Sequence, residues 1–186
     1  MKLGILICFL VSLAATGTSL AQTPSVKSEP QTKIERFQAR TGAVLIKNFS
    51  EIGSLAGLGG TASATSWEFT DAQSGRKEYG ISIEVKESSR LEREERAFID
   101  YDEIDSLLKG IDYISAVKKG KLHNFQADYK TTGDLKVSVF DEADGTIRAA
   151  VGVGRITAVS VYYDIPTLGA FRKMIVDAKS TLDGIK

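Results

Sequence analysis

Acidic side chains gather ahead of an apolar helical pattern in the segment "FIDYDEIDSLLKGIDYI". Four carboxylates fall within six positions, those of Asp100, Asp102, Glu103 and Asp105. Such a group could bind a hard cation through converging oxygens, or it could begin a helix, because acids accept hydrogen bonds from the free N–H groups there. The spacing is not that of an EF-hand loop. We expect Asp100 or Asp102 to cap the helix, and the sequence leaves open whether the four acids bind a cation.

An internal repeat favours the capping interpretation. A shift of 64 residues aligns Asp100 with Asp164 and Ile104 with Leu168. After Asp164 the second copy has Ile165, Pro166 and Thr167 in place of further acids. The copies therefore share one acid at a helix start and not a set of metal ligands.

Catalytic residues are sparse. The only histidine, His123, lies in the basic segment "KKGKLHNF" with Lys118, Lys119 and Lys121, which would suit a general base or an anionic partner but is typical of a solvated loop. No G-x-S-x-G or H-E-x-x-H motif occurs. We predict no catalytic, cofactor-binding or metal-binding residue and expect a chain that is not an enzyme; a hydrolase using His123 or the acidic cluster is the second alternative.

The first 21 residues have the pattern of a secretory signal peptide: Lys2, an apolar run from Leu3 to Ala15, and a small-x-small site ending at Ala21. Cleavage there would leave a mature chain from Gln22, secreted or periplasmic. It would also remove the only cysteine, Cys8, which lies inside the apolar run and does not fit a lipid-anchor site. The mature chain would be disulfide-free, with 23 Lys plus Arg against 24 Asp plus Glu.

The glycine-rich segment "SEIGSLAGLGGTASATS" allows two interpretations. Closely spaced glycines can bring backbone N–H groups near a phosphate. However, no Lys-Ser or Lys-Thr pair follows, and no helical pattern begins there. We expect a flexible hairpin connection between two strands.

Alternating apolar residues predict antiparallel strands in both halves, each half ending in an amphipathic helix. The predicted fold class is α+β: antiparallel sheets with two helices in a duplicated β-β-β-β-α unit. The predicted organisation is a signal peptide (1–21), a flexible spacer (22–32) and a single domain (33–186) of two pseudo-repeats, about 33–120 and 121–186. In each repeat the helix can cover its own sheet, and the sheets together bury one core.

This duplicated unit is similar in topology to the PUR and Whirly nucleic-acid-binding proteins, and the resemblance directs attention to the solvent side of the sheets. We place Thr65, Trp67 and Phe69 on the core side, and on the solvent side Ser66, Glu68, Ser82, Glu84, Lys86, Gln126, Asp128, Lys130, Lys136, Ser138 and Arg148. That solvent side has mixed charge and almost no aromatic residue for stacking.

The leading hypothesis is an exported, non-enzymatic binding or structural domain whose ligand the sequence does not identify. Its partner would be a protein or a cell-envelope component rather than nucleic acid, and we expect no stable membrane insertion after signal cleavage. The first alternative is a single-stranded nucleic-acid-binding module.

Overall fold

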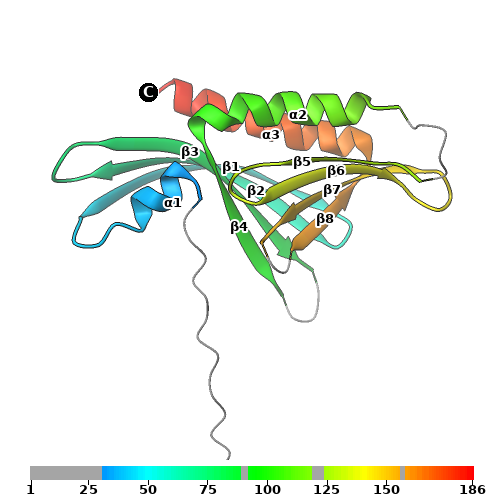
Figure 1. Ribbon diagram of the computed structural model, residues 1–186, viewed down its shortest axis with the longest axis horizontal. Coiled ribbons are helices and arrows are strands. Elements are labelled where there is room, and N and C mark those ends of the chain that lie inside the picture. Colours follow the sequence, from blue (N-terminus) through cyan, green and yellow to red (C-terminus); the bar gives the residue numbers. More distant parts are fainter. Residues whose placement is uncertain (1–30, 89–91, 119–123, 156–157) are drawn as a thin grey trace, which may run out of the picture.

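The computed structural model describes residues 31–88, 92–118, 124–155 and 158–186 (Figure 1). Two antiparallel sheets of four strands follow chain order, which confirms the predicted α+β class. Sheet 1 contains β1 (Leu45–Gly57), β2 (Gly60–Asp71), β3 (Lys77–Glu87) and β4 (Glu94–Asp100), and sheet 2 contains β5 (Gln126–Lys130), β6 (Leu135–Asp141), β7 (Ile147–Val153) and β8 (Val159–Tyr163). Most of the predicted signal peptide and spacer lies outside the described residues.

Three helices accompany the sheets: α1 (Lys33–Gln38), α2 (Ile104–Ala116) and α3 (Ile165–Asp183). The two amphipathic helices of the prediction are α2 and α3, and α1 is additional. A 3₁₀ turn over Tyr101–Glu103 leads into α2. Among the described helices, none combines the length and apolar character needed to cross a membrane.

The helices α2 and α3 lie side by side, and each packs on the sheet of the other half (Figure 1). Helix α2 contacts β5 and β6, and the Tyr129 hydroxyl of β5 donates a hydrogen bond to Ser106 Oγ of α2 at 2.8 Å. Helix α3 packs mainly on β1 and β2, where the buried Ser66 Oγ donates to the Ala178 carbonyl at 2.9 Å. The expectation that each helix covers its own sheet was therefore wrong.

One continuous core fills the space between the sheets and these helices. Fully buried aliphatic side chains come from both halves, including Ile81 and Ile83 of β3, Leu107 of α2 and Val151 of β7. The ring of Phe171 in α3 is also fully buried and stacks on Tyr163, with centroids 6.4 Å apart. The main core is therefore shared by both halves.

The period-two pattern of β2 was correct, but its two faces were assigned the wrong way round. Ser66 and Glu68, predicted to face solvent, lie on the face that α3 covers, in line with Ala62 and Ala64. The small side chains of Ala62, Ala64 and Ser66 let α3 approach the sheet closely. The aromatic residues Trp67 and Phe69, predicted for the core side, lie on the opposite, outer face, where Ile34 and Phe37 of α1 join Phe69 in a second apolar cluster.

Two other predicted solvent positions are also buried. Ser82 is 2 % exposed because Trp67 covers it and donates its indole N–H to Ser82 Oγ at 2.9 Å. Ser138 is 3 % exposed on the outer face of sheet 2. The remaining predicted positions are exposed or half-buried: Glu84, Lys86, Gln126, Asp128, Lys130, Lys136 and Arg148.

The glycine-rich segment forms paired strands. β1 continues to Gly57 and β2 begins at Gly60, so the connection consists of Leu58 and Gly59 alone. Gly59 has a φ of +85°, which glycine adopts without strain. A hairpin was expected here, but the flexible connection is much shorter than predicted, and Leu58 also exchanges two backbone hydrogen bonds with Tyr162 of β8.

Candidate functional site

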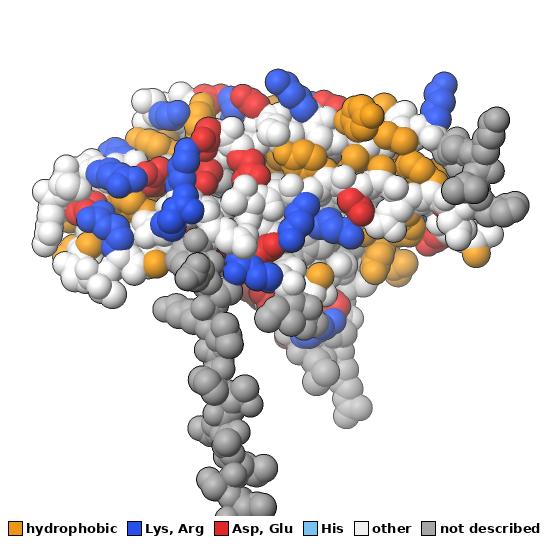
Figure 2. All heavy atoms as spheres, viewed as in Figure 1, with side chains coloured by type: hydrophobic (Ala, Val, Ile, Leu, Met, Phe, Trp, Pro, Cys, Tyr) orange, Lys and Arg blue, Asp and Glu red, His pale blue; other side chains and the backbone are white. Residues whose placement is uncertain are grey.

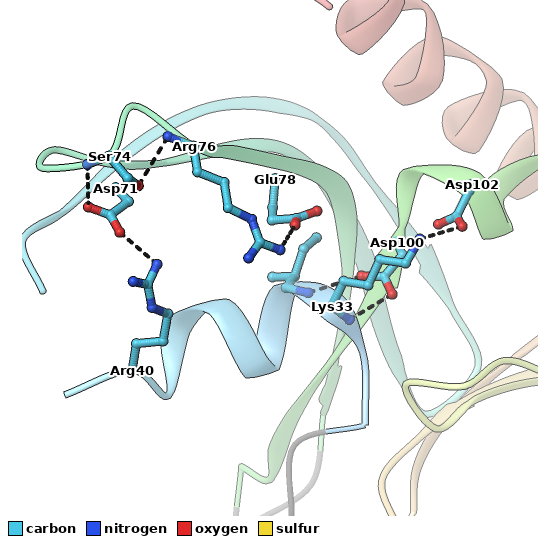
Figure 3. Close-up of polar contacts among 9 residues, drawn as sticks. Lys33, Arg40, Asp71, Ser74, Arg76, Glu78, Asp100 and Asp102 are labelled. Carbon is cyan, nitrogen blue, oxygen red and sulfur yellow. Dashed lines mark hydrogen bonds and ion pairs between the residues drawn. The ribbon is translucent and has the colours of Figure 1, made fainter.

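The four acids ahead of α2 point to different partners. The Asp100 carboxylate accepts hydrogen bonds from Lys33 N at 2.7 Å and Ile34 N at 3.1 Å, both in the first turn of α1 (Figure 3). Asp102 pairs with Lys33 Nζ at 2.5 Å, an interaction that raises the pKa of Lys33 and lowers the pKa of Asp102. Both of these acids therefore secure α1.

The other two acids bind elsewhere. Glu103 accepts from Thr132 N at 2.8 Å in the β5–β6 turn, and Asp105 lies 3.8 Å from Lys179 Nζ in α3. Each of the four carboxylates has its own protein partner. In the part of the chain that the structure describes, no group of three or more His, Cys, Asp or Glu side chains could hold a metal ion.

The prediction that Asp100 or Asp102 caps the helix that follows was wrong, because the start of α2 has no side-chain cap. Asp100 instead supports α1, which lies 66 to 67 residues earlier in the chain: Thr32 and Glu35 form the capping box of α1, and Asp100 accepts from the N–H groups of Lys33 and Ile34. Asp164 does cap α3 by accepting from Thr167 N at 2.8 Å. The shared acid of the two copies thus has two different functions.

Most of the basic segment around His123 lies outside the described residues. His123, Lys119 and Lys121 lie outside the described residues, and Lys118, which is described, is exposed.

A cleft of about 390 Å³ lies beside α1 and is lined by Lys33, Arg36, Phe37, Arg40 and Arg76. We call it the α1 cleft. Four of its five lining side chains are cationic and none is acidic. Figure 2 shows Lys and Arg side chains gathered around α1, with Asp and Glu side chains between them.

Carboxylates outside the lining hold two of the guanidinium groups (Figure 3). Arg40 Nη1 lies 2.6 Å from Asp71 Oδ2, and Arg76 Nη2 lies 2.6 Å from Glu78 Oε1. Each of these two pairs uses a single terminal nitrogen of the arginine, which leaves further N–H donors on the same planar group. The two arginines are therefore oriented before any ligand arrives.

Asp71 is itself fixed by the β2–β3 turn. Its Oδ1 accepts from Gln73 N at 2.9 Å and from Ser74 N at 3.2 Å. These bonds lower the pKa of Asp71 to about 2, and the bond from Gln73 N has the largest effect. The hydrogen bond from Arg40 also lowers this pKa. The carboxylate that holds Arg40 thus remains ionised well into the acid range.

Phe37 forms the apolar part of the cleft. The Cζ atoms of Arg40 and Arg76 lie 5.6 and 5.5 Å from the centre of its ring, within the range of cation–π attraction. The ring is only 3 % exposed and belongs to the cluster that anchors α1 on sheet 1. A rigid aromatic group therefore spaces the two guanidinium groups.

Arg36 differs from the other cations of the cleft. Its guanidinium donates to the Gln31 carbonyl, a neutral acceptor, and no ion pair among the described residues involves it. Its positive charge is therefore less neutralised than that of Arg40 or Arg76.

A second cleft, of about 210 Å³, lies on the outer face of sheet 2. Lys130 and Lys136 line it, but so does Asp134, whose carboxylate lies 2.8 Å from Lys130 Nζ and 2.7 Å from Arg155 Nε. Ser138 forms part of its wall together with small side chains. An acid inside the lining makes this cleft less suited to an anion than the α1 cleft.

The sequence contains a signal for the α1 cleft in the spacing of its basic residues. Lys33, Arg36 and Arg40 recur at i, i+3 and i+7, on the helix face next to the apolar pair Ile34 and Phe37. Arg76 could not have been added from spacing, because a β-hairpin brings it to the helix.

Comparison with models of known protein families gave no match to this chain, and comparison with curated proteins gave none either.

Proposed function

We propose that this chain is an exported, non-enzymatic binding domain whose α1 cleft binds an anionic group, a carboxylate or a phosphate, of a protein or cell-envelope component. The observation that carries the proposal is the lining: four cationic side chains around one aromatic ring, with no acid among them. Guanidinium groups match the planar geometry of carboxylates and phosphates.

Preorganisation supports this assignment. The ion pairs to Asp71 and Glu78 and the contact with Phe37 already fix Arg40 and Arg76, so a ligand would immobilise few additional side-chain bonds. Arg36 adds a charge that the described ion pairs do not neutralise. Export rests on the signal-peptide pattern of residues 1–21.

A single-stranded nucleic-acid-binding module is the second candidate. The observation in its favour is the outer face of sheet 1, where the exposed Phe49 lies 4.9 Å from Trp67, centroid to centroid. Acids on the same face, Glu51 and Glu84, oppose a polyanion. A hydrolase has less support, because the four acids ahead of α2 do not converge on one site.

The test is a titration of the isotope-labelled protein with inorganic phosphate at low salt, followed by amide chemical shifts. We expect the shifts to concentrate on residues 33–40 and 76. Replacing Arg36 and Arg76 together by Gln should weaken binding by about tenfold or more, since a hydrogen bond to a charged group contributes about 1.5–3 kcal/mol. Arg96→Gln, which removes an arginine paired with Glu84 elsewhere on sheet 1, is the matched control and should have no effect.

Shifts spread evenly over the surface, or binding equal in both variants, would show that the α1 cleft is not an anion site. A parallel titration with a single-stranded oligonucleotide separates the second candidate. We expect no affinity tighter than the ~10⁻⁴ to 10⁻⁶ M typical of non-specific binding. Submicromolar binding that falls steeply with added salt would favour the nucleic-acid module instead.

A further inference from the structure

β1 is an edge strand with an open side. It pairs with β2 along its length, and in the described part of sheet 1 no strand pairs with its other edge. Three apolar side chains at this edge are largely exposed, Val44 at 62 %, Ile46 at 48 % and Phe49 at 61 %. A long apolar edge of this kind is a template for pairing with another strand.

The register shows which backbone groups face the open side. Val44 O accepts from Ala72 N at 2.9 Å, and the register continues without a shift to the pair Ser50↔Ser66. Because antiparallel bonding alternates along a strand, the odd-numbered residues from Leu45 to Glu51 direct their N–H and C=O groups away from β2. These groups are available to a new strand.

The side chains around Phe49 are complementary to their own copy. If a second β1 pairs antiparallel with its two-fold axis at Phe49, Lys47 of each copy lies opposite Glu51 of the other, and Phe49 lies opposite Phe49. All three pairs use residues whose backbone groups face the open side. No ion pair among the described residues involves Glu51 or Lys47. Lys47 Nζ donates to Gln38 Oε1 at 3.2 Å and lies 5.7 Å from the centre of the Phe69 ring.

Two further features fit this arrangement. The register shifts between Glu51 and Gly53, so the symmetric ladder ends just after the charged pair on each strand. On the helix-covered face, an apolar hollow of about 170 Å³ opens at the same edge beside Asn48, Ser50 and Ile185, the last being 53 % exposed. A second copy would cover this hollow.

We propose that two copies of this chain associate through their β1 strands, antiparallel and centred on Phe49, to form one continuous eight-stranded sheet. We assign the partner strand to a second copy of this chain because antiparallel pairing about Phe49 places each Lys47 opposite a Glu51 of the other copy. This proposal is independent of the α1 cleft.

The test uses charge reversal and sedimentation velocity over a wide range of protein concentration. Lys47→Glu leaves acids at both opposed positions, and Glu51→Lys leaves lysines at both. Each single variant should dimerise about tenfold or more weakly than the wild type. An equimolar mixture of the two, and the double variant Lys47→Glu/Glu51→Lys, should both regain the dimer. Lys109→Glu, an equal charge change on an exposed position of α2, should leave it unaltered.

Cross-linking tests the register. In a Cys8→Ser background, Phe49→Cys should form a disulfide with its own copy, since Cα atoms of a hydrogen-bonded pair lie about 5.5 Å apart. Lys47→Cys alone should not cross-link, but it should when mixed with Glu51→Cys. Thermal melts followed by circular dichroism verify that each variant is folded.

A wild-type chain that is monomeric at every concentration overturns the proposal. This holds even if the β1 edge pairs with a strand of another protein. A dimer whose affinity is unchanged by every charge reversal overturns it as well.

Discussion

At the scale of single residues, Asp100 joins distant parts of the chain. It is 7 % exposed and accepts two backbone N–H groups of α1, so it satisfies donors that a six-residue helix leaves free. The sequence indicated that an acid here would cap a helix. It could not indicate which helix, because the helix that follows in the chain was the nearest candidate and α1 approaches only in the folded protein.

We predict that Asp100→Ala lowers the free energy of unfolding by about 0.5–2 kcal/mol, the usual cost of removing a cap. Asp100→Asn should lower it less, because the amide oxygen can still accept one of the two N–H bonds. Urea denaturation measures both.

Asp102→Ala is the control for this prediction. Asp102 is an exposed partner of Lys33, and such surface pairs contribute only about 0–1 kcal/mol. An Asp102→Ala variant as unstable as Asp100→Ala would argue that charge near Lys33, and not the cap, holds α1.

At the scale of elements, alternation and helical periodicity identified the strands and the two long helices. They did not identify which face of β2 is covered by a helix. Alternation assigns faces reliably when one side is solvated, whereas β2 is covered on both sides, by α3 and by α1. The small residues Ala62 and Ala64 mark the face of close helix approach, and Trp67 and Phe69 fill the wider space under α1.

Two helical glycines allow a paired prediction about these contacts. At Gly110 of α2, an added Cβ would lie 2.1 Å from Cδ2 of Tyr129 on β5. Ala favours a helix over Gly by about 1 kcal/mol, but overpacking costs about 1–3 kcal/mol. Since its bond to Ser106 restrains Tyr129, we expect Gly110→Ala to lower the melting temperature.

Gly169→Ala in α3 is the matched substitution. Apart from the adjacent residues and backbone of α3 itself, no atom lies within 4 Å of the added Cβ, so the propensity gain should appear as a higher melting temperature. If both variants shift the melting temperature in the same direction, the close contact between α2 and β5 is not as described.

At the scale of the whole molecule, the sequence predicted the fold class and the repeated order of strands and helix. The exchange of helices between the sheets could not be predicted, because both apolar stripes fit either sheet and periodicity carries no information about partners. The α1 cleft was missed for a related reason: it combines α1 with the β2–β3 turn, which only the folded chain brings together.

The proposed export yields a prediction about processing and location. If residues 1–21 are a signal peptide, the mature protein begins at Gln22 and is found outside the cytoplasm. Cell fractionation and N-terminal sequencing of the product measure this. A cytoplasmic product that retains Met1 would contradict the proposed compartment.

The helix exchange also has a consequence for biosynthesis. The ribosome delivers the strands of sheet 1 first, but α3, the helix that shields Ala62, Ala64 and Ser66, comes after all eight described strands. Until about Asp183 has emerged, this face of the nascent chain is open to water and to other nascent chains. Folding of the first half therefore waits for the synthesis of α3, and any message truncated before α3 yields a product with an uncovered sheet.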